Sequence, residues 1–243
     1  MHAESRCPAI FVTGTDTGVG KTLVASALAR HFSAKGMNVG VMKPIETGVA
    51  NPAALGPDAT LLSWASESTD SDDHISPYRF SKALAPCQAA TAAKEPIETK
   101  KIFEAYHAVC HEKEIVIVEG AGGLMVPVRG GYIMADLARQ LGLPLLVITH
   151  PRLGTLNHTL LTTFAARAME LEISGFIINQ MPAIPDEAEQ SAPHLLSSLA
   201  SADLLGVLPE VIGSDQEKVK ILANELDKMP AYQWLLNGLG LLP

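Results

Sequence analysis

The sequence predicts an α/β fold in which a mostly parallel central sheet is covered by helices on both faces. Short branched apolar runs alternate with segments of helical spacing, which is the pattern of a sheet buried on both sides. A glycine-rich loop separates the first apolar run from the first helical segment. The chain has 243 residues, of which 47% are hydrophobic, so we expect one large core and a single domain over residues 1–243.

The expected strands are six apolar runs. They cover residues 10–12, 39–42, 115–118, 143–148, 176–178 and 204–208. Helical spacing is clearest after the first run, over residues 23–32, and after the fourth, over residues 156–168. Because ligands gather at the carboxyl ends of parallel strands, function is expected from the polar residues that follow these runs.

Glycines and polar clusters predict where elements end. Gly36 follows the first helical segment and Gly175 precedes the fifth run, and both are expected to end helices. Residues 50–76 are rich in Pro, Ser and Asp, and the acidic cluster at residues 70–73 predicts a solvated loop. No role is assigned to the segment after residue 210.

Composition excludes several classes of partner. The net charge is -8 and the basic residues are scattered, so we expect no nucleic-acid partner. Three cysteines, Cys7, Cys87 and Cys110, are widely separated, which predicts neither a disulfide framework nor a CxxC metal site. No apolar run approaches the roughly 20 residues of a spanning helix, and no targeting signal is visible. We therefore expect a cytoplasmic protein without a membrane partner.

The loop FVTGTDTGVGKT at residues 11–22 carries the strongest functional signal. A Walker A loop, G-x-x-x-x-G-K-[ST], wraps phosphate oxygens with backbone N–H groups, while its Lys reaches the outer phosphates and its hydroxyl holds Mg²⁺. Lys21 and Thr22 match these roles, although Thr15 stands where the first Gly is usual. The sequence therefore predicts a P-loop NTPase fold. The expected nucleotide contacts are Thr17, Gly18, Val19, Gly20, Lys21, Thr22 and Leu23.

Asp16 argues against one class of P-loop protein. Dimerising ATPases that position division septa or partition chromosomes carry KGGVGKT, and aligning that string on GVGKT sets its first Lys on Asp16. A carboxylate cannot neutralise the γ-phosphate of a partner. A nucleotide-switch ATPase stays open as an alternative function, as does a small-molecule kinase built on the same loop.

Further charged residues lie close to the ends of predicted strands. Glu119 ends the third run before four small residues, which is the arrangement by which a Walker B carboxylate meets Mg²⁺. Lys43 follows the second run; it either stabilises charge during phosphoryl transfer or is an exposed surface lysine. Asp58 is either an acidic residue in the first turn of a helix or a third Mg²⁺ ligand.

Asn179 is the candidate reader of the nucleotide base. No [NT]KxD string of the guanine-specific type follows a predicted strand, so adenine is favoured. The amide of Asn179, at the end of the fifth run, can pair with the N6/N7 edge of adenine. The other interpretation is an ordinary turn residue at the end of a strand.

The chain contains three distinctive strings: TGTDTGVGKT at residues 13–22, KPIETG at 43–48 and VEGAGG at 118–123. Together with SPYRF at 76–80 and RLGTLNH at 152–158, they resemble the signatures of the dethiobiotin synthetase family, up to about residue 210. KPIxTG is the specific part, because related synthetases and partition ATPases share the phosphate loop without it. The resemblance implies an ATP-dependent ligase of biotin biosynthesis.

That resemblance also implies the substrates: Mg²⁺-ATP, CO₂ (or bicarbonate) and 7,8-diaminononanoate. A carbamate on one amine would be phosphorylated by the γ-phosphate to a carbamic-phosphoric anhydride, and the second amine would then close the ring. Lys21 and Lys43 would bind the phosphates and the carbamate, with Lys43 as the active-site lysine. The implied Mg²⁺ ligands are Thr22, Asp58 and Glu119.

Other residues match positions that surround the substrates in this family. Thr47 matches the position that contacts the diamine, and Pro86 and Cys87 would line the groove for its aliphatic chain. The remaining implied nucleotide contacts are Gly120, Ala121, Gly122, Asn179, Gln180, Pro209 and Glu210.

The resemblance implies a homodimer with active sites at the subunit interface. Leu153, Gly154 and Asn157 would begin a helix whose N-terminus binds the substrate carboxylate held by the other subunit. A single subunit would then carry an incomplete diamine site.

Overall fold

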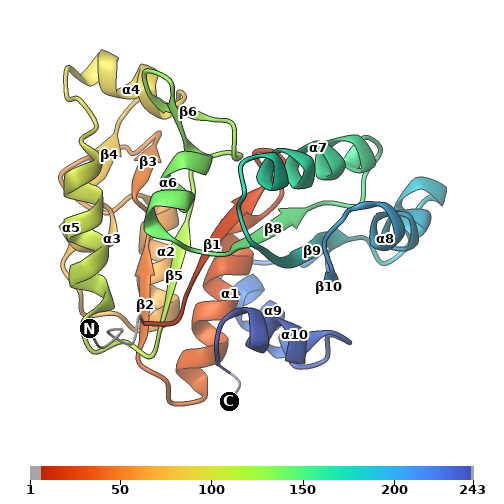
Figure 1. The fold of residues 1–243 in the computed structure, drawn as a ribbon. Helices are drawn as coiled ribbons and strands as arrows, with labels where there is room; N and C mark the ends of the chain where they lie inside the picture. Colours follow the sequence, from red (N-terminus) through yellow and green to blue (C-terminus); the bar gives the residue numbers. More distant parts are fainter. Residues whose placement is uncertain (1–6, 242–243) are drawn as a thin grey trace, which may run out of the picture.

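A parallel sheet forms the centre of the molecule. The computed structural model describes residues 7–241, and within them the central sheet has six strands in the order β10-β9-β8-β1-β5-β2, all paired in parallel. They are β1 (Ala9–Gly14), β2 (Val39–Met42), β5 (Ile115–Glu119), β8 (Leu145–Thr149), β9 (Ile173–Met181) and β10 (Leu204–Pro209). Every predicted apolar run lies wholly or largely within one of these strands, so the predicted α/β class is confirmed (Figure 1).

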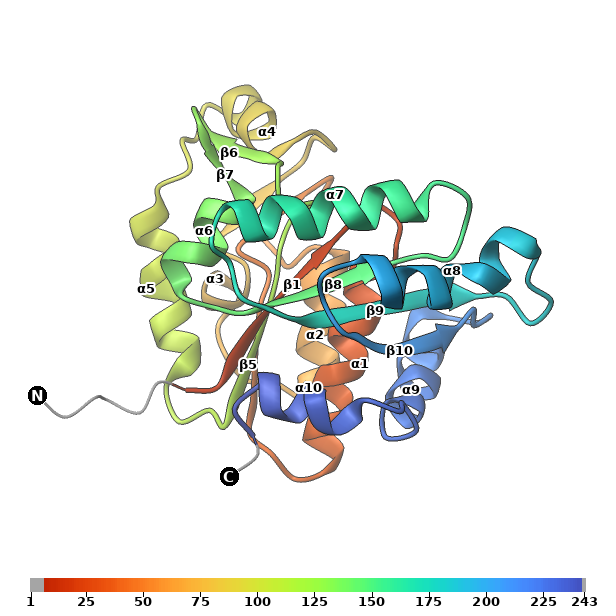
Figure 2. The ribbon, with the colours of Figure 1, turned by 45° about the vertical axis from the view of Figure 1, so that its right-hand side comes forward.

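Helices cover both faces of the sheet, which explains why its strands are apolar on both sides (Figure 2). Successive residues of a strand point to opposite faces; thus Ile10 and Val12 pack into one core cluster and Phe11 into another. The first cluster contains residues of α1 (Lys21–Ala34), α2 (Pro57–Ser66), α9 (Asp215–Leu226) and α10 (Tyr232–Gly238). The second contains residues of α5 (Thr99–Cys110) and α6 (Met134–Leu141), while α7 (Thr155–Ala168) and α8 (Glu187–Leu199) pack beside β8 and β9.

Short strands that the sequence did not predict follow β2 and β5. β3 (Ile45–Thr47) pairs in parallel with β4 (Tyr78–Phe80), and β6 (Pro127–Arg129) pairs antiparallel with β7 (Tyr132–Ile133). The helix α4 (Pro86–Ala93) packs against β3, β4 and β6. These elements are added at the carboxyl ends of β2 and β5, where parallel sheets place their ligand sites.

The segment from residue 50 to residue 76 contains two helices as well as the acidic cluster that was predicted to be a solvated loop. It contains α2 and a single turn, α3 (Asp72–Ile75), and Leu62 of α2 is fully buried. Asp70, from the acidic cluster, forms an ion pair of 3.2 Å with Lys113. The cluster is solvated as predicted at Ser71, Asp72 and Asp73, but it is not all loop, because Asp72 begins α3. The helix start suggested at Asp58 is correct, since Asp58 lies in the first turn of α2.

One of the two predicted glycine boundaries is correct. Gly36 follows α1 with a φ of +85°, and its N–H donates to Ser33 O, so it ends the helix as expected. Gly175 instead lies inside β9, where an added Cβ would lie 2.6 Å from Leu205 Cγ. Its role as a helix end was wrong; the space between β9 and β10 requires a glycine.

The chain after residue 210 forms α9 and α10, which pack on the α1 side of the sheet. His31 of α1 anchors them: its Nδ1 lies 3.0 Å from Ala223 O and its Nε2 2.7 Å from the Tyr232 hydroxyl. A carbonyl can only accept, so Nδ1 carries the proton and Nε2 accepts from the tyrosine. Among the described residues, no helix is long and apolar enough to cross a membrane.

Candidate active site

The predicted phosphate loop joins β1 to α1 and borders a cavity of about 370 Å³. Gly18 and Gly20 have φ angles of +74° and +88°, which other residues disfavour. The chain can thus turn sharply, and α1 begins at Lys21 with its N-terminal N–H groups and dipole facing the loop, an arrangement that attracts anions. Sequence-predicted residues lining this cavity are Thr17, Gly18, Gly20, Lys21, Thr22, Leu23, Lys43, Thr47, Asp58, Glu119, Ala121, Gly122 and Gln180.

Side chains from the end of β9 hold the loop in place. Asn179 Nδ2 donates to Val19 O and Gln180 Nε2 donates to Gly18 O, each over 3.0 Å. Asn179 approaches so closely that a Cβ on Gly20 would lie 2.2 Å from its Nδ2. The glycine at this position therefore serves both the turn and the contact with β9.

Two charged residues of the loop also bind its own backbone. Lys21 Nζ donates to Asp16 O over 2.8 Å, and Asp16 Oδ1 accepts from the Thr17 N–H over 2.7 Å. Asp16 thus takes the local role of a turn residue that the sequence allows. The pKa of Lys21 is lowered by burial, while the charge of Glu119 acts in the opposite direction.

The buried Lys43 and Glu119 form an ionic cluster with the partly exposed Asp58 beside the loop. Lys43 Nζ lies 2.6 Å from Glu119 Oε1 and 2.8 Å from Asp58 Oδ2, and it also donates to Gly120 O over 3.3 Å. The Thr22 hydroxyl donates to Glu119 Oε1 over 2.8 Å. Lys43 is 4% exposed, which excludes the alternative of an exposed surface lysine.

Opposed electrostatic effects act on this cluster. Burial by itself lowers the pKa of Lys43, but the charges of Glu119 and Asp58 outweigh it and raise that pKa above its usual value. The pKa of Glu119 is raised by its complete burial, against the ammonium of Lys43. Lys43 is therefore held in its charged form, as a group that stabilises developing negative charge must be.

The oxygen atoms of the cluster fit a hard divalent cation. Glu119 Oε2 is buried and has no hydrogen-bond partner among the described residues, although a buried carboxylate oxygen normally has one. Thr22 and Asp58 present a hydroxyl and a second carboxylate to the same cavity. Oxygen ligands of this kind are those that Mg²⁺ prefers.

Glu46, which was not among the predicted site residues, lies in the same cavity. Glu46 is 3% exposed, and its carboxylate accepts from the N–H groups of Asp58 and Ala59 at the start of α2. Its pKa is raised by burial, against these two hydrogen bonds. The sequence offered one signal for Glu46: it is a charged residue within KPIETG, between the candidate residues Lys43 and Thr47.

Comparison with known proteins assigns this chain to a family. A family model described as an AAA domain matches residues 8–218. The ATP-dependent dethiobiotin synthetase BioD of Thermodesulfovibrio yellowstonii is 40% identical, over 86% of this chain and 91% of its own. The proteins of the same name from Bacillus subtilis and Bacillus cereus are 36% and 37% identical, over 86% and 87% of this chain and 90% of theirs.

This chain belongs to the dethiobiotin synthetase family. Its fold is shared more widely. A ParA family ATPase from Chlorobium tepidum covers 97% of this chain and 100% of its own, with a TM-score of 0.56 and 16% identity. The MinC:MinD cell division complex of Aquifex aeolicus has a TM-score of 0.54 and 14% identity, and it covers 96% of this chain and 93% of its own. At such identities the likeness concerns the fold alone, and it confirms the predicted P-loop architecture.

In this member of the dethiobiotin synthetase family, a second, smaller cavity adjoins the phosphate loop. Its volume is about 140 Å³. Residues lining it include Leu23, Arg152, Asn179, Gln180, Pro209 and Glu210, so the structure brings together the residues that were predicted to surround adenine. Because the Asn179 amide nitrogen already binds Val19 O, its reading of the base stays a prediction.

The start of α7 lies outside both cavities, although the dethiobiotin synthetase resemblance implies a substrate contact there. Gly154 precedes α7 with a φ of +96°, and Leu153 is 90% exposed. Asn157 is also exposed. The structure thus leaves these residues accessible rather than bringing them to the phosphate loop of the same chain.

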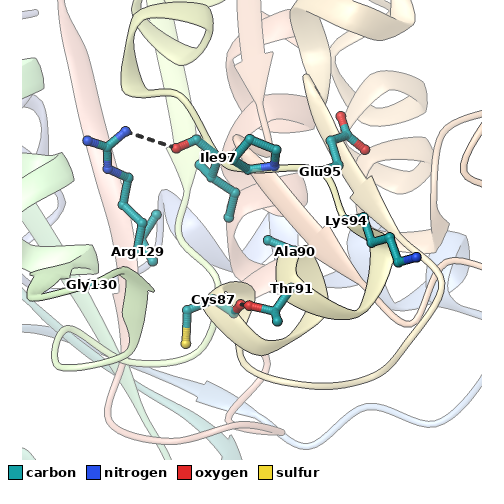
Figure 3. A pocket seen from close by; sticks show the side chains of 10 residues that line it. Cys87, Ala90, Thr91, Lys94, Glu95, Ile97, Arg129 and Gly130 are labelled. Atoms are coloured by element: carbon teal, nitrogen blue, oxygen red, sulfur yellow. Dashed lines mark hydrogen bonds between the residues drawn. The ribbon is translucent and has the colours of Figure 1, made fainter.

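A further cavity lies away from the phosphate loop. It has a volume of about 410 Å³ between α4, the segment after it and β6. Figure 3 shows its apolar wall with Cys87 and Ala90 of α4, and the Arg129 guanidinium donating to Ile97 O over 3.3 Å. Of Pro86 and Cys87, which were predicted to line the groove for the aliphatic chain, only Cys87 lines this cavity, so the groove stays a prediction.

Proposed function

We propose that this chain makes dethiobiotin, ADP and phosphate from 7,8-diaminononanoate, CO₂ and ATP. Membership of the family gives the reaction, and one observation in the site supports it most directly. The buried Lys43 ammonium lies between Glu119 and Asp58 and borders the same cavity as Lys21. Phosphoryl transfer to a carbamate brings two anions together, and two ammonium groups in one cavity suit that charge.

The proposed first step forms a carbamic-phosphoric anhydride. One amine of the diamine adds to CO₂ and loses a proton, giving a carbamate. A carbamate oxygen attacks the γ-phosphorus of ATP, and the bond to the β,γ-bridging oxygen breaks, releasing ADP. The loop N–H groups and Lys21 hold the phosphates, while Lys43 stabilises charge on the transferred group.

The second step closes the ring. The neutral second amine attacks the carbonyl carbon of the anhydride, the carbon–oxygen bond to phosphate breaks, and the amine proton is lost to solvent or to phosphate. Thr47, at the edge of the cavity, is proposed to orient the diamine. When bound by Thr22, Asp58 and Glu119, Mg²⁺ would neutralise charge on the ATP phosphates.

We infer that the active form is a cytoplasmic homodimer. A cavity of about 390 Å³ lies between the loop residues Gly14–Thr17, the segment 122–127 and α7. Around it, Met125, Leu161 and Phe164 are 60%, 58% and 70% exposed. Large apolar side chains that are exposed near one cavity suggest an interface. A second copy covering it would bring its own Leu153, Gly154 and Asn157 towards the substrate carboxylate.

A nucleotide-switch ATPase is the second candidate function, because it would use the same phosphate loop and α1 N-terminus. Asp16 opposes it, since its carboxylate binds the adjacent Thr17 N–H where such a switch requires a cation. The third candidate, a small-molecule kinase, would release a stable phosphorylated product.

One assay separates the three. The purified chain is incubated with ATP, Mg²⁺, bicarbonate and 7,8-diaminononanoate, and phosphate and products are measured together. Diamine-dependent phosphate release with a ring-closed product is expected. Phosphate release that ignores the diamine would support the switch, and a phosphorylated diamine without cyclisation would support the kinase.

A further inference from the structure

The helix α2 begins without a capping side chain of its own. Gly56 precedes it with extended backbone angles and no side-chain hydrogen bond, and Pro57 has no N–H. The first-turn donors that need partners therefore belong to Asp58 and Ala59. Both are satisfied from a different element, because Glu46 of β3 accepts from Asp58 N over 2.8 Å and from Ala59 N over 3.2 Å.

Gly56 is shaped to admit this distant carboxylate. A Cβ built on Gly56 would lie 2.4 Å from both Glu46 Cδ and Glu46 Oε1, closer than atoms can approach. The Glu46 carboxylate thus occupies the place that the side chain of an ordinary Ser or Asp cap would take. Residues 46 and 56 form a matched pair, a long acid facing a residue with no side chain.

This contact determines where Asp58 lies. The backbone of Asp58 binds Glu46, while its side chain reaches Lys43 over 2.8 Å. The Asp58 side chain is 38% exposed, so it has room to move away from the cluster if the start of α2 loosens. Glu46 is 3% exposed and therefore has little freedom of its own.

We propose that Glu46 is a positioning residue that fixes Asp58, through the start of α2, in the orientation needed to hold the Mg²⁺ of the bound nucleotide. The metal part of this inference rests on the proposed function; the capping of α2 does not. Outer groups that orient a metal ligand typically change metal affinity by about 10- to 100-fold. Glu46 is not assigned a contact with the reacting atoms.

The test exploits the matched pair. Glu46→Ala removes the distant cap, Gly56→Ser adds a local cap that collides with Glu46, and the double variant combines the local cap with the space it needs. Glu67→Gln is the control, since it removes a carboxylate at the far end of α2, where Glu67 pairs with Arg30.

Two measurements are made on each folded variant. Hydrogen exchange of the Asp58 and Ala59 amides, without nucleotide or metal, reports the cap itself. Calorimetric titration of Mg²⁺ into the ADP-loaded protein reports the metal site, independently of ring closure. If the native chain does not make dethiobiotin, the proposed function is refuted. The hydrogen-exchange result would still test whether Glu46 caps α2.

Each single variant should speed exchange at both amides and weaken Mg²⁺ binding by about tenfold or more. The double variant should recover protection at Ala59, which a serine cap can reach, and most of the Mg²⁺ affinity. The control should match the native protein. If the double variant regains protection while Mg²⁺ binding stays weak, or if Glu46→Ala binds Mg²⁺ normally, the positioning role is wrong. Where Glu46→Ala does not fold, Glu46→Gln takes its place and should show a smaller loss.

Discussion

Replacing Lys43 by Met tests whether its ammonium is the counterion of the buried Glu119. Lys43→Met keeps most of the side-chain volume and removes the charge next to a carboxylate that is 0% exposed. At an effective dielectric constant of about 20, charges 2.6 Å apart attract by about 6 kcal/mol. Desolvation offsets part of this, so we expect the free energy of unfolding to fall by about 3–5 kcal/mol at pH 8.

The loss of stability in Lys43→Met should become smaller at acidic pH. Without the ammonium, burial raises the pKa of Glu119 further above its ordinary value of 4.5, so the folded variant binds a proton that the unfolded chain has released. Stability of the variant therefore falls as the pH rises above 4.5. The slope is at most about 1.4 kcal/mol per pH unit, while only the folded form is protonated.

Urea unfolding at pH 5 and pH 8, without Mg²⁺, measures both effects. The double variant Lys43→Met/Glu119→Gln should recover most of the stability and lose the pH dependence, because no buried charge is left unpaired. Lys228→Met, at a lysine whose side chain is 65% exposed, serves as the control. If Lys43→Met is as stable as the native protein at pH 8, the reasoning is refuted. At temperatures where it is folded, its turnover should be lower by orders of magnitude.

Four further outcomes are expected. Thr22→Val should impair the use of Mg²⁺-ATP more than that of the diamine, and equal changes in initial-rate titrations of each would contradict the metal assignment. Phe164→Asp should give a monomer in analytical ultracentrifugation with most ring-closing activity lost; a variant that stays dimeric would exclude this face of α7. Asn179→Ala removes the hydrogen bond to Val19 O and should cost about 1–3 kcal/mol of stability and weaken ATP-analogue binding in calorimetry, whereas unchanged affinity would show that the loop does not need it. Burial lowers the pKa of His31 below its usual 6.5, so stability should be full above pH 6.5 and decline below it as the unfolded chain takes up the proton; the same decline of melting temperature in His31→Phe would sink this assignment.

The central sheet was predictable because most of its strands are nearly continuous apolar runs. A strand such as Ile115–Glu119, buried at every position, is recognised by its continuous apolar run rather than by alternation. β3 and β4, of three residues each, have too little sequence to show a period and form only because they pair with each other. Only the start of α2 was suggested, by Asp58 as a residue of a first helical turn. The rest was hidden because Pro and Ser are frequent in the segment around it.

Most of the site was predictable where a backbone motif determines the side-chain role. The glycine loop identified Lys21 and Thr22, and the carboxylate after a buried strand identified Glu119, because each role follows from the position at a strand end. Glu46 was not predictable in this way. Its partners are backbone N–H groups 12 and 13 residues away, and only the folded path of α2 brings them together.

The contacts from the end of β9 have an effect on the loop that reaches beyond stability. In a planar trans peptide the C=O and the following N–H point in opposite directions. With the carbonyls of Gly18 and Val19 turned towards Gln180 and Asn179, the N–H groups of Val19 and Gly20 are turned away from those amides. The loop is thus preorganised. The conformational entropy of aligning its N–H donors is lost when the chain folds, so less of it is lost when a triphosphate binds.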